Sequence, residues 1–142
     1  MSDITCTLVN GIKPESVPEK IVALYLYGSA LTGRLRIDSD VDIAMLCSYK
    51  VAPYDRLELI ADVEHIVTKL LLTISIKNSV SVLDLRGKYV PFELQYKVIT
   101  QGKLLFDRDK GQRYDYELAA TRDYFDFMPF IEELRRKKHG KL

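Results

Sequence analysis

The chain has 142 residues, about the size of one domain, and its 21 Lys and Arg nearly balance 20 Asp and Glu, leaving a formal net charge of +1. This balance argues against a protein whose whole surface grips nucleic acid, and we expect no direct nucleic-acid binding. Hydrophobic residues make up 47% and charged residues 29%, which is typical of a globular domain. No apolar run of about 18 residues and no signal peptide are evident, so we expect no membrane partner and a cytoplasmic location. We expect one domain over residues 1–142, because each half alone would bury little surface.

Apolar runs and turn residues, taken in chain order, predict a small α/β (α+β) protein. Residues 1–16 are expected to form an irregular lead-in, because Pro14 and Pro18 limit regular structure. Short apolar runs predict four strands, at 21–27, 41–47, 80–85 and 103–106, the last possibly an edge strand. Helical spacing predicts one or two turns at 30–36 and longer helices at 53–71, 92–100 and 111–138. The expected core spans about 20–107, and the helical region at about 111–138 follows it.

The helix expected from Pro53 has the clearest pattern, because proline suits a first turn and apolar residues recur at spacings of three and four. The residues of this stripe are Leu57, Ile60, Val63, Ile66, Val67, Leu70 and Leu71.

The last predicted helix has two unusual features. Pro129 lies inside it and is expected to kink or split it, since proline removes a backbone hydrogen bond. Residues 124–134 carry apolar side chains on more than one helical face. Either a partner covers part of this surface, or the kinked helix wraps around the domain and buries both faces.

Four residues form the constellation that carries chemistry. Gly28 and Ser29 end the first strand, and ten residues separate them from Asp40 and Asp42 at the start of the second. Alternate strand residues point the same way, so the two aspartates share a face. Two carboxylates about 5 Å apart repel by roughly 3 kcal/mol at an effective dielectric of about 20, which favours a cation between them.

Magnesium fits this set better than an all-protein calcium site, because magnesium is typically held by one or two carboxylates, waters and substrate phosphates. Glycine allows a phosphate to approach the backbone, and Ser29 offers a hydroxyl and an N–H at the start of a helical turn. We therefore predict a nucleotide triphosphate on Gly28 and Ser29, and metal on Asp40 and Asp42. One metal would activate an acceptor hydroxyl and another would steady the leaving pyrophosphate.

Residues 24–33 (LYLYGSALTG) and 39–44 (SDVDIA) resemble the GSx10DxD motif of the DNA polymerase beta-type nucleotidyltransferases. The chain length and residues 98–106 (VITQGKLLF) resemble the minimal nucleotidyltransferases, which are antitoxins paired with HEPN-domain ribonuclease toxins. The resemblance covers about residues 20–107. It implies a small mixed sheet flanked by helices and magnesium-dependent transfer of AMP from ATP to a tyrosine of a HEPN partner, which silences that toxin in a hetero-oligomer.

One position departs from this family. Its third carboxylate lies on a later strand, where the aligned residue here is Ser81, although a later aspartate, Asp84, is kept. By strand alternation Ser81 and Asp84 point to opposite faces, so Asp84 does not simply replace the ligand. Ala30 also stands where the family often has a basic or polar residue. Arg34 and Arg36 either contact phosphate in its place or are solvated loop charges.

Three functions remain open on the sequence. The leading one is AMP transfer to a protein partner by an antitoxin. The second is a catalytically weak or dead homologue that neutralises the toxin by binding alone, which Ser81 favours. The third is a small-molecule nucleotidyltransferase, which usually needs a second domain to build its acceptor pocket, and few residues follow Phe106 here.

Overall fold

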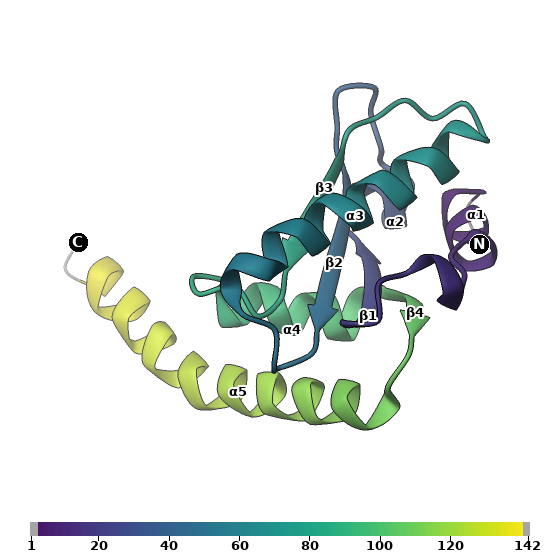
Figure 1. Ribbon diagram of the computed structural model, residues 1–142. Coiled ribbons are helices and arrows are strands. Elements are labelled where there is room, and N and C mark those ends of the chain that lie inside the picture. Colours follow the sequence, from purple (N-terminus) through teal and green to yellow (C-terminus); the bar gives the residue numbers. More distant parts are fainter. Residues whose placement is uncertain (1–2, 141–142) are drawn as a thin grey trace.

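The computed structural model describes residues 3–140 and shows a sheet with helices on both faces (Figure 1). The strands are β1 (Ile21–Tyr27), β2 (Val41–Cys47), β3 (Val80–Asp84) and β4 (Lys103–Asp107). The helices are α1 (Asp3–Gly11), α2 (Ser29–Thr32), α3 (Pro53–Leu72), α4 (Phe92–Gln101) and α5 (Lys110–Gly140), with a 3-10 turn η1 (Pro14–Ser16). None of the helices within residues 3–140 combines the length and apolar character needed to cross a bilayer.

The sheet is mixed, as the resemblance implied. Its order is β3-β2-β1-β4, with β1 antiparallel to both β2 and β4 and with β2 parallel to β3. A parallel pair needs a long crossover, which α3 supplies between β2 and β3. The short strand β4 lies at an edge, as the sequence indicated.

Each face of the sheet buries a separate set of apolar side chains. The face covered by α1 and α3 buries residues such as Leu26, Ile43 and Val67. The other face, covered by α4 and the first half of α5, buries Tyr25, Leu46 and others. Both inner strands are therefore apolar almost throughout, which explains why their sequences are continuous apolar runs instead of alternating patterns.

The expectation of an irregular lead-in at residues 1–16 was wrong. Helix α1 fills residues 3–11 and packs on α3, where Gly11 lies so close to Leu70 that a Cβ at position 11 would overlap it. This segment is rich in β-branched and polar residues that form helices poorly. Tertiary packing of Ile4, Leu8 and Ile12 stabilises it instead.

Two details of the predicted helices also differ. In α3 the fully buried stripe runs through Leu59, Val63, Val67 and Leu71, whereas Leu57 is 66% exposed and lies outside the core. Helix α5 is not split at Pro129, and Figure 1 shows it bending gradually over its C-terminal half. Pro129 is exposed, so water can satisfy the backbone carbonyl that the proline leaves without its helical donor.

Candidate active site

The turn after β1 places Gly28 directly against Asp42. Gly28 adopts φ 76° and ψ −155°, a conformation that is essentially restricted to glycine. A Cβ at this position would overlap the Oδ2 atom of Asp42. The glycine is therefore required both by its backbone angles and by the close approach of the carboxylate.

Ser29 begins α2, which is a single turn of four residues ending at Gly33 in the left-handed conformation. The sequence predicted one or two turns here, and the shorter outcome matters for phosphate binding. One turn has few aligned peptide dipoles, so charged side chains must supply most of the attraction for a phosphate.

Asp42 lies on β2, the strand that is flanked by β1 and β3 in the sheet. Its register partners are Tyr27 on β1 and Ser81 on β3. Burial and then the charge of Asp40 raise the pKa of Asp42 above its ordinary value. Burial and then the charge of Asp42 raise the pKa of Tyr27 to about 12, so its hydroxyl stays protonated at neutral pH. Negative charge is thus concentrated at this end of the sheet before any ligand binds.

Asp40 lies just before β2, in the connection between α2 and β2, and Asn78 holds this connection in place. The Asn78 side-chain amide donates hydrogen bonds to the carbonyl oxygens of Arg36 and Ser39, at 2.7 Å each, and of Ile37 at 3.4 Å. Sequence reasoning missed Asn78, because an asparagine before a strand is typical of an ordinary turn. Its role depends on residues about forty positions away, which only the fold brings near.

Ser81, which the resemblance aligned with the third carboxylate of the family, lies beside Asp42 in the parallel register. Asp84 does not take its place. The Asp84 carboxylate accepts a hydrogen bond at 2.6 Å from Nε of Arg56 on α3 and another at 3.0 Å from the backbone N–H of Arg86. Its register partner is Met45, three positions along β2 from Asp42. Asp84 is thus engaged in an ion pair with the helix on the other face.

The donor set still fits a magnesium ion that shares its ligands with a substrate. Within residues 3–140 no group of three or more His, Cys, Asp or Glu side chains comes together, so a closed protein cage is not formed. Two carboxylates that repel each other, one of them against a glycine that lines an open cavity, suit a hard cation whose other ligands are phosphate oxygens and water.

A cavity of about 380 Å³ lies beside the Gly28–Ser29 turn. Its walls come from the end of β1, from α2 and the turns beside it, and from the C-terminal half of α4 with the glycine that follows it. They are Tyr27, Gly28, Ser29, Leu31, Thr32, Arg34, Lys97, Gln101 and Gly102. Arg34 lines it and Arg36 does not, which separates the two arginines that the sequence left equivalent. Lys97 and Gln101 were missed, because their place on α4 gives no hint that α4 packs beside this turn.

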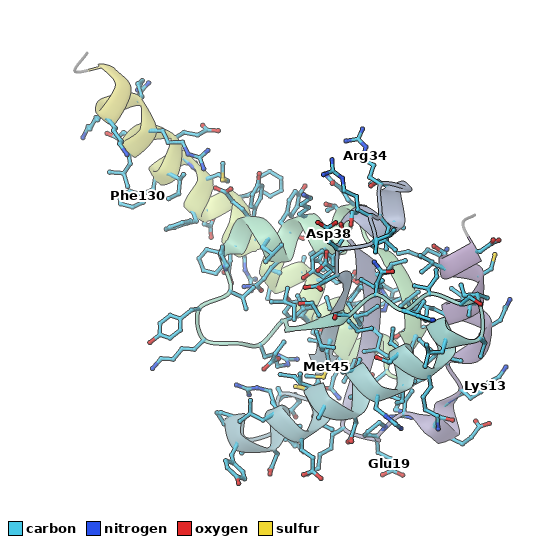
Figure 2. The ribbon with its side chains drawn as sticks, turned by 90° about the horizontal axis from the view of Figure 1, so that it is seen from above. Lys13, Glu19, Arg34, Asp38, Met45 and Phe130 are labelled. Carbon is cyan, nitrogen blue, oxygen red and sulfur yellow. The ribbon has the colours of Figure 1, made fainter. Side chains whose placement is uncertain are left out.

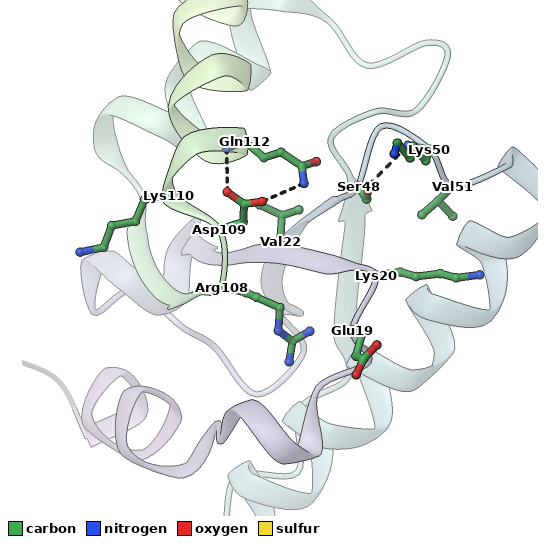
Figure 3. A pocket seen from close by; sticks show the side chains of 10 residues that line it. All are labelled: Glu19, Lys20, Val22, Ser48, Lys50, Val51, Arg108, Asp109, Lys110 and Gln112. Atoms are coloured by element: carbon green, nitrogen blue, oxygen red, sulfur yellow. Dashed lines mark hydrogen bonds between the residues drawn. The ribbon is translucent and has the colours of Figure 1, made fainter.

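A second cavity of about 600 Å³ lies at the opposite end of β1, between the start of that strand and the start of α5 (Figure 3). The Arg108 guanidinium in its wall donates hydrogen bonds to the carbonyl oxygens of Pro14, Val17 and Pro18, so it holds the lead-in segment. None of the residues predicted to carry chemistry lines this cavity.

Comparison with known families now decides the class of protein. A family model described as polymerase beta nucleotidyltransferase matches residues 12–111, which is more than half of the chain. The chain belongs to the polymerase beta nucleotidyltransferase family. The matched segment of this nucleotidyltransferase contains the turn at Gly28, both aspartates and the strand with Ser81.

Several solved structures similar to this nucleotidyltransferase are described as toxin–antitoxin complexes. One is a toxin–antitoxin with AMP-PNP, at 23% identity and a TM-score of 0.57, covering 94% of this chain and 97% of the other. Another is a tri-AMPylated Shewanella oneidensis HEPN toxin with MNT antitoxin, at 21% identity and a TM-score of 0.54, covering 93% and 96%. A third is an MntA–HpeT complex with two Asp-to-Glu substitutions, at 22% identity and a TM-score of 0.54, covering 93% and 95%. At these identities the likeness establishes the fold. No curated protein matches the chain.

Proposed function

We propose that this nucleotidyltransferase is an antitoxin that transfers AMP from magnesium-bound ATP to a tyrosine hydroxyl of a HEPN ribonuclease toxin and thereby silences it. The observation that carries the proposal is the close approach of the Asp42 carboxylate to Gly28, whose turn lines a cavity, together with the charge of Asp40 acting on Asp42. Similar folds occur in toxin–antitoxin complexes, one with an AMPylated HEPN toxin and one with the ATP analogue AMP-PNP. Because ATP is the donor, the proposed compartment is the cytoplasm and the proposed assembly is a hetero-oligomer with the toxin.

Each part of the site has a role in the proposed transfer. The backbone at Gly28 and Ser29 receives the triphosphate, and the cationic side chains of Arg34 and Lys97 lie on the same cavity wall to offset its charge. Asp40 and Asp42 would hold magnesium, which supplies charge neutralisation and orientation of the phosphates. The tyrosine oxygen bonds to the α-phosphorus, the bond from that phosphorus to the pyrophosphate oxygen breaks, and the phenolic proton leaves to solvent.

A second candidate is neutralisation by binding alone, and Ser81 is the observation that favours it. A hydroxyl beside Asp42 is a weaker ligand than a carboxylate, and Asp84 is paired with Arg56. This arrangement predicts a slower transfer than three carboxylates would support, because the second metal or the activation of the acceptor is weakened.

Intact mass of the HEPN protein encoded beside this gene tests the proposal after co-expression. The wild-type chain is expected to add whole AMP units, and the Asp40→Asn/Asp42→Asn variant is expected to add none. An unmodified toxin that still co-purifies and is silent would select the binding mechanism. AMP transfer to small hydroxyl compounds without any protein partner would select the small-molecule enzyme.

A further inference from the structure

An exposed apolar surface lies along α4 and the second half of α5. We call it the α4–α5 surface and define it by Tyr89, Phe92, Phe125, Phe127, Phe130 and Leu134. These side chains are large and mostly apolar, and about half or more of the surface of several is exposed: Tyr89 is 87% exposed, Phe130 55% and Leu134 48%. Phe127 connects two of the other rings, with its centroid 5.3 Å from that of Phe92 and 5.9 Å from that of Phe130. Exposed apolar side chains that are grouped in this way mark an interaction site.

The chain itself does not cover this surface. The first half of α5 is tied to the sheet, because Tyr25 donates a hydrogen bond to Glu117 and Arg113 bridges Glu117 and Asp107 at 3.0 Å each. The second half packs against α4, through ring contacts such as Phe92 with Phe127 at 5.3 Å. Figures 1 and 2 show this half, with Phe130, projecting beyond the rest of the molecule. The expectation that a kinked helix would bury both faces is therefore wrong within the described residues.

The α4–α5 surface is continuous with the candidate active site. The cavity at Gly28–Ser29 shares Lys97 and Gln101 with a hollow of about 470 Å³ along α4. That hollow in turn shares Pro91 and Glu93 with a third one of about 440 Å³, whose walls include Phe127. Three hollows with common walls thus lead from the site to the exposed rings. A nucleotide is too small to contact all three hollows, whereas a protein that presents an acceptor side chain to the site can lie along them.

The rim of the surface indicates the charge of the occupant. Glu93 and Arg135 form an exposed ion pair at 3.1 Å across the α4–α5 junction. Residues 132–138 that follow carry four basic and two acidic side chains, all exposed. A partner face that is apolar at its centre and acidic where it meets the end of α5 complements this arrangement.

We infer that the α4–α5 surface is the docking face for the HEPN protein, which lies across α4 and α5 while its acceptor tyrosine enters the cavity at Gly28–Ser29. This inference rests on the proposed function, because it takes the occupant to be the protein that receives AMP. It adds the location of the interface, which the active-site residues alone do not determine.

The test is the affinity of the HEPN protein for variants of the full chain, measured by calorimetry without ATP so that no transfer occurs. Phe130→Glu and Leu134→Glu each place a negative charge on the part of the surface that projects on α5, and each is expected to weaken binding at least tenfold, as substitutions at interface hot spots do. Leu72→Glu is the matched control, because Leu72 is an exposed leucine at the C-terminal end of α3, the end of that helix that lies away from α5 in Figure 1. It is expected to bind like the wild type. Phe130→Ser, together with thermal unfolding of each variant, separates loss of the interface from loss of the fold.

The outcomes distinguish this inference from the proposed function. Variants at Phe130 and Leu134 that fold and bind the HEPN protein like the wild type overturn the docking face, whether or not the toxin then receives AMP. Variants that abolish self-association of the chain while leaving HEPN binding intact overturn it too, and identify the surface as an interface between two copies. A wild-type chain that binds no HEPN protein overturns the proposed function itself and, with it, this inference.

Discussion

Replacing Gly28 by alanine tests the central contact of the candidate site. Alanine at φ 76° and ψ −155° carries a backbone strain of about 1–3 kcal/mol. Its Cβ also overlaps Oδ2 of Asp42, and moving that carboxylate off its rotamer costs about 0.5–1.5 kcal/mol more. The lower entropy of unfolded alanine offsets about 0.4–1 kcal/mol of these costs. We expect Gly28→Ala to lower the free energy of unfolding by about 2 kcal/mol.

Urea denaturation followed by circular dichroism measures this loss, and Gly33→Ala is the matched control. Gly33 also has a positive φ, of 75°, but it lies in the ordinary left-handed region and a Cβ there meets nothing within 4 Å. Its loss is expected to stay near 0.5 kcal/mol, since left-handed strain of about 1 kcal/mol is partly offset by the same entropy gain.

A double variant isolates the contact with the carboxylate. Removing the Asp42 side chain beyond Cβ in Gly28→Ala/Asp42→Ala is expected to relieve the overlap, so the two substitutions should be non-additive by about 1 kcal/mol. Two results would refute the reasoning that the Asp42 carboxylate leaves no room for a Cβ at position 28. One is an equal loss of unfolding free energy for Gly28→Ala and Gly33→Ala, and the other is strict additivity of Gly28→Ala with Asp42→Ala.

Three further predictions concern charge and ligands at the same end of the sheet. Because the folded protein raises the pKa of Asp42, ionisation of this carboxyl favours the unfolded state, and the free energy of unfolding is expected to fall as pH rises from the ordinary pKa of 3.8 through the raised pKa. Asp42→Asn should remove this pH dependence in urea titrations at several pH values, and it should also abolish AMP transfer. Lys97→Gln is expected to weaken binding of a fluorescent ATP analogue about tenfold, while Lys69→Gln on α3 should bind normally, and equal affinities would exclude Lys97 from the phosphate site. Ser81→Asp is expected to raise the rate of AMP transfer in single-turnover mass measurements, whereas an unchanged rate would place position 81 outside the metal shell.

The parts of the fold that follow from local pattern were predictable from the sequence. The strand over 41–47 was predicted at its observed bounds, because an apolar run there follows a polar turn and is buried on both faces. The neighbouring positions of Gly28, Asp42 and Ser81 were expected only from the resemblance to a known family, because local patterns do not pair residues of different strands. Patterns of this kind reach only a few residues along the chain.

The parts that depend on packing were not predictable in this way. Helix α1 forms because α3 covers it, and its own residues favour helix only weakly. Leu57 matches the helical spacing of α3 but falls just outside the arc that the sheet covers. Lys97 and Asn78 reach the site from elements that the chain places there only when the sheet has assembled.

The hold of Asn78 on the connection before Asp40 has a consequence for nucleotide affinity. Ordering a residue of a free loop costs about 1–2 kcal/mol of conformational entropy, so a mobile segment would make each binding event bear that cost. Here the side-chain amide of Asn78, just before β3, binds three carbonyls of the segment, and the backbone N–H of Val41 donates to the Ser79 carbonyl at 2.9 Å beside it. The entropy is lost once, when the chain folds, and Asp40 then meets its cation as a pre-organised ligand. Truncating Asn78 is thus expected to weaken nucleotide binding by loosening the segment before Asp40.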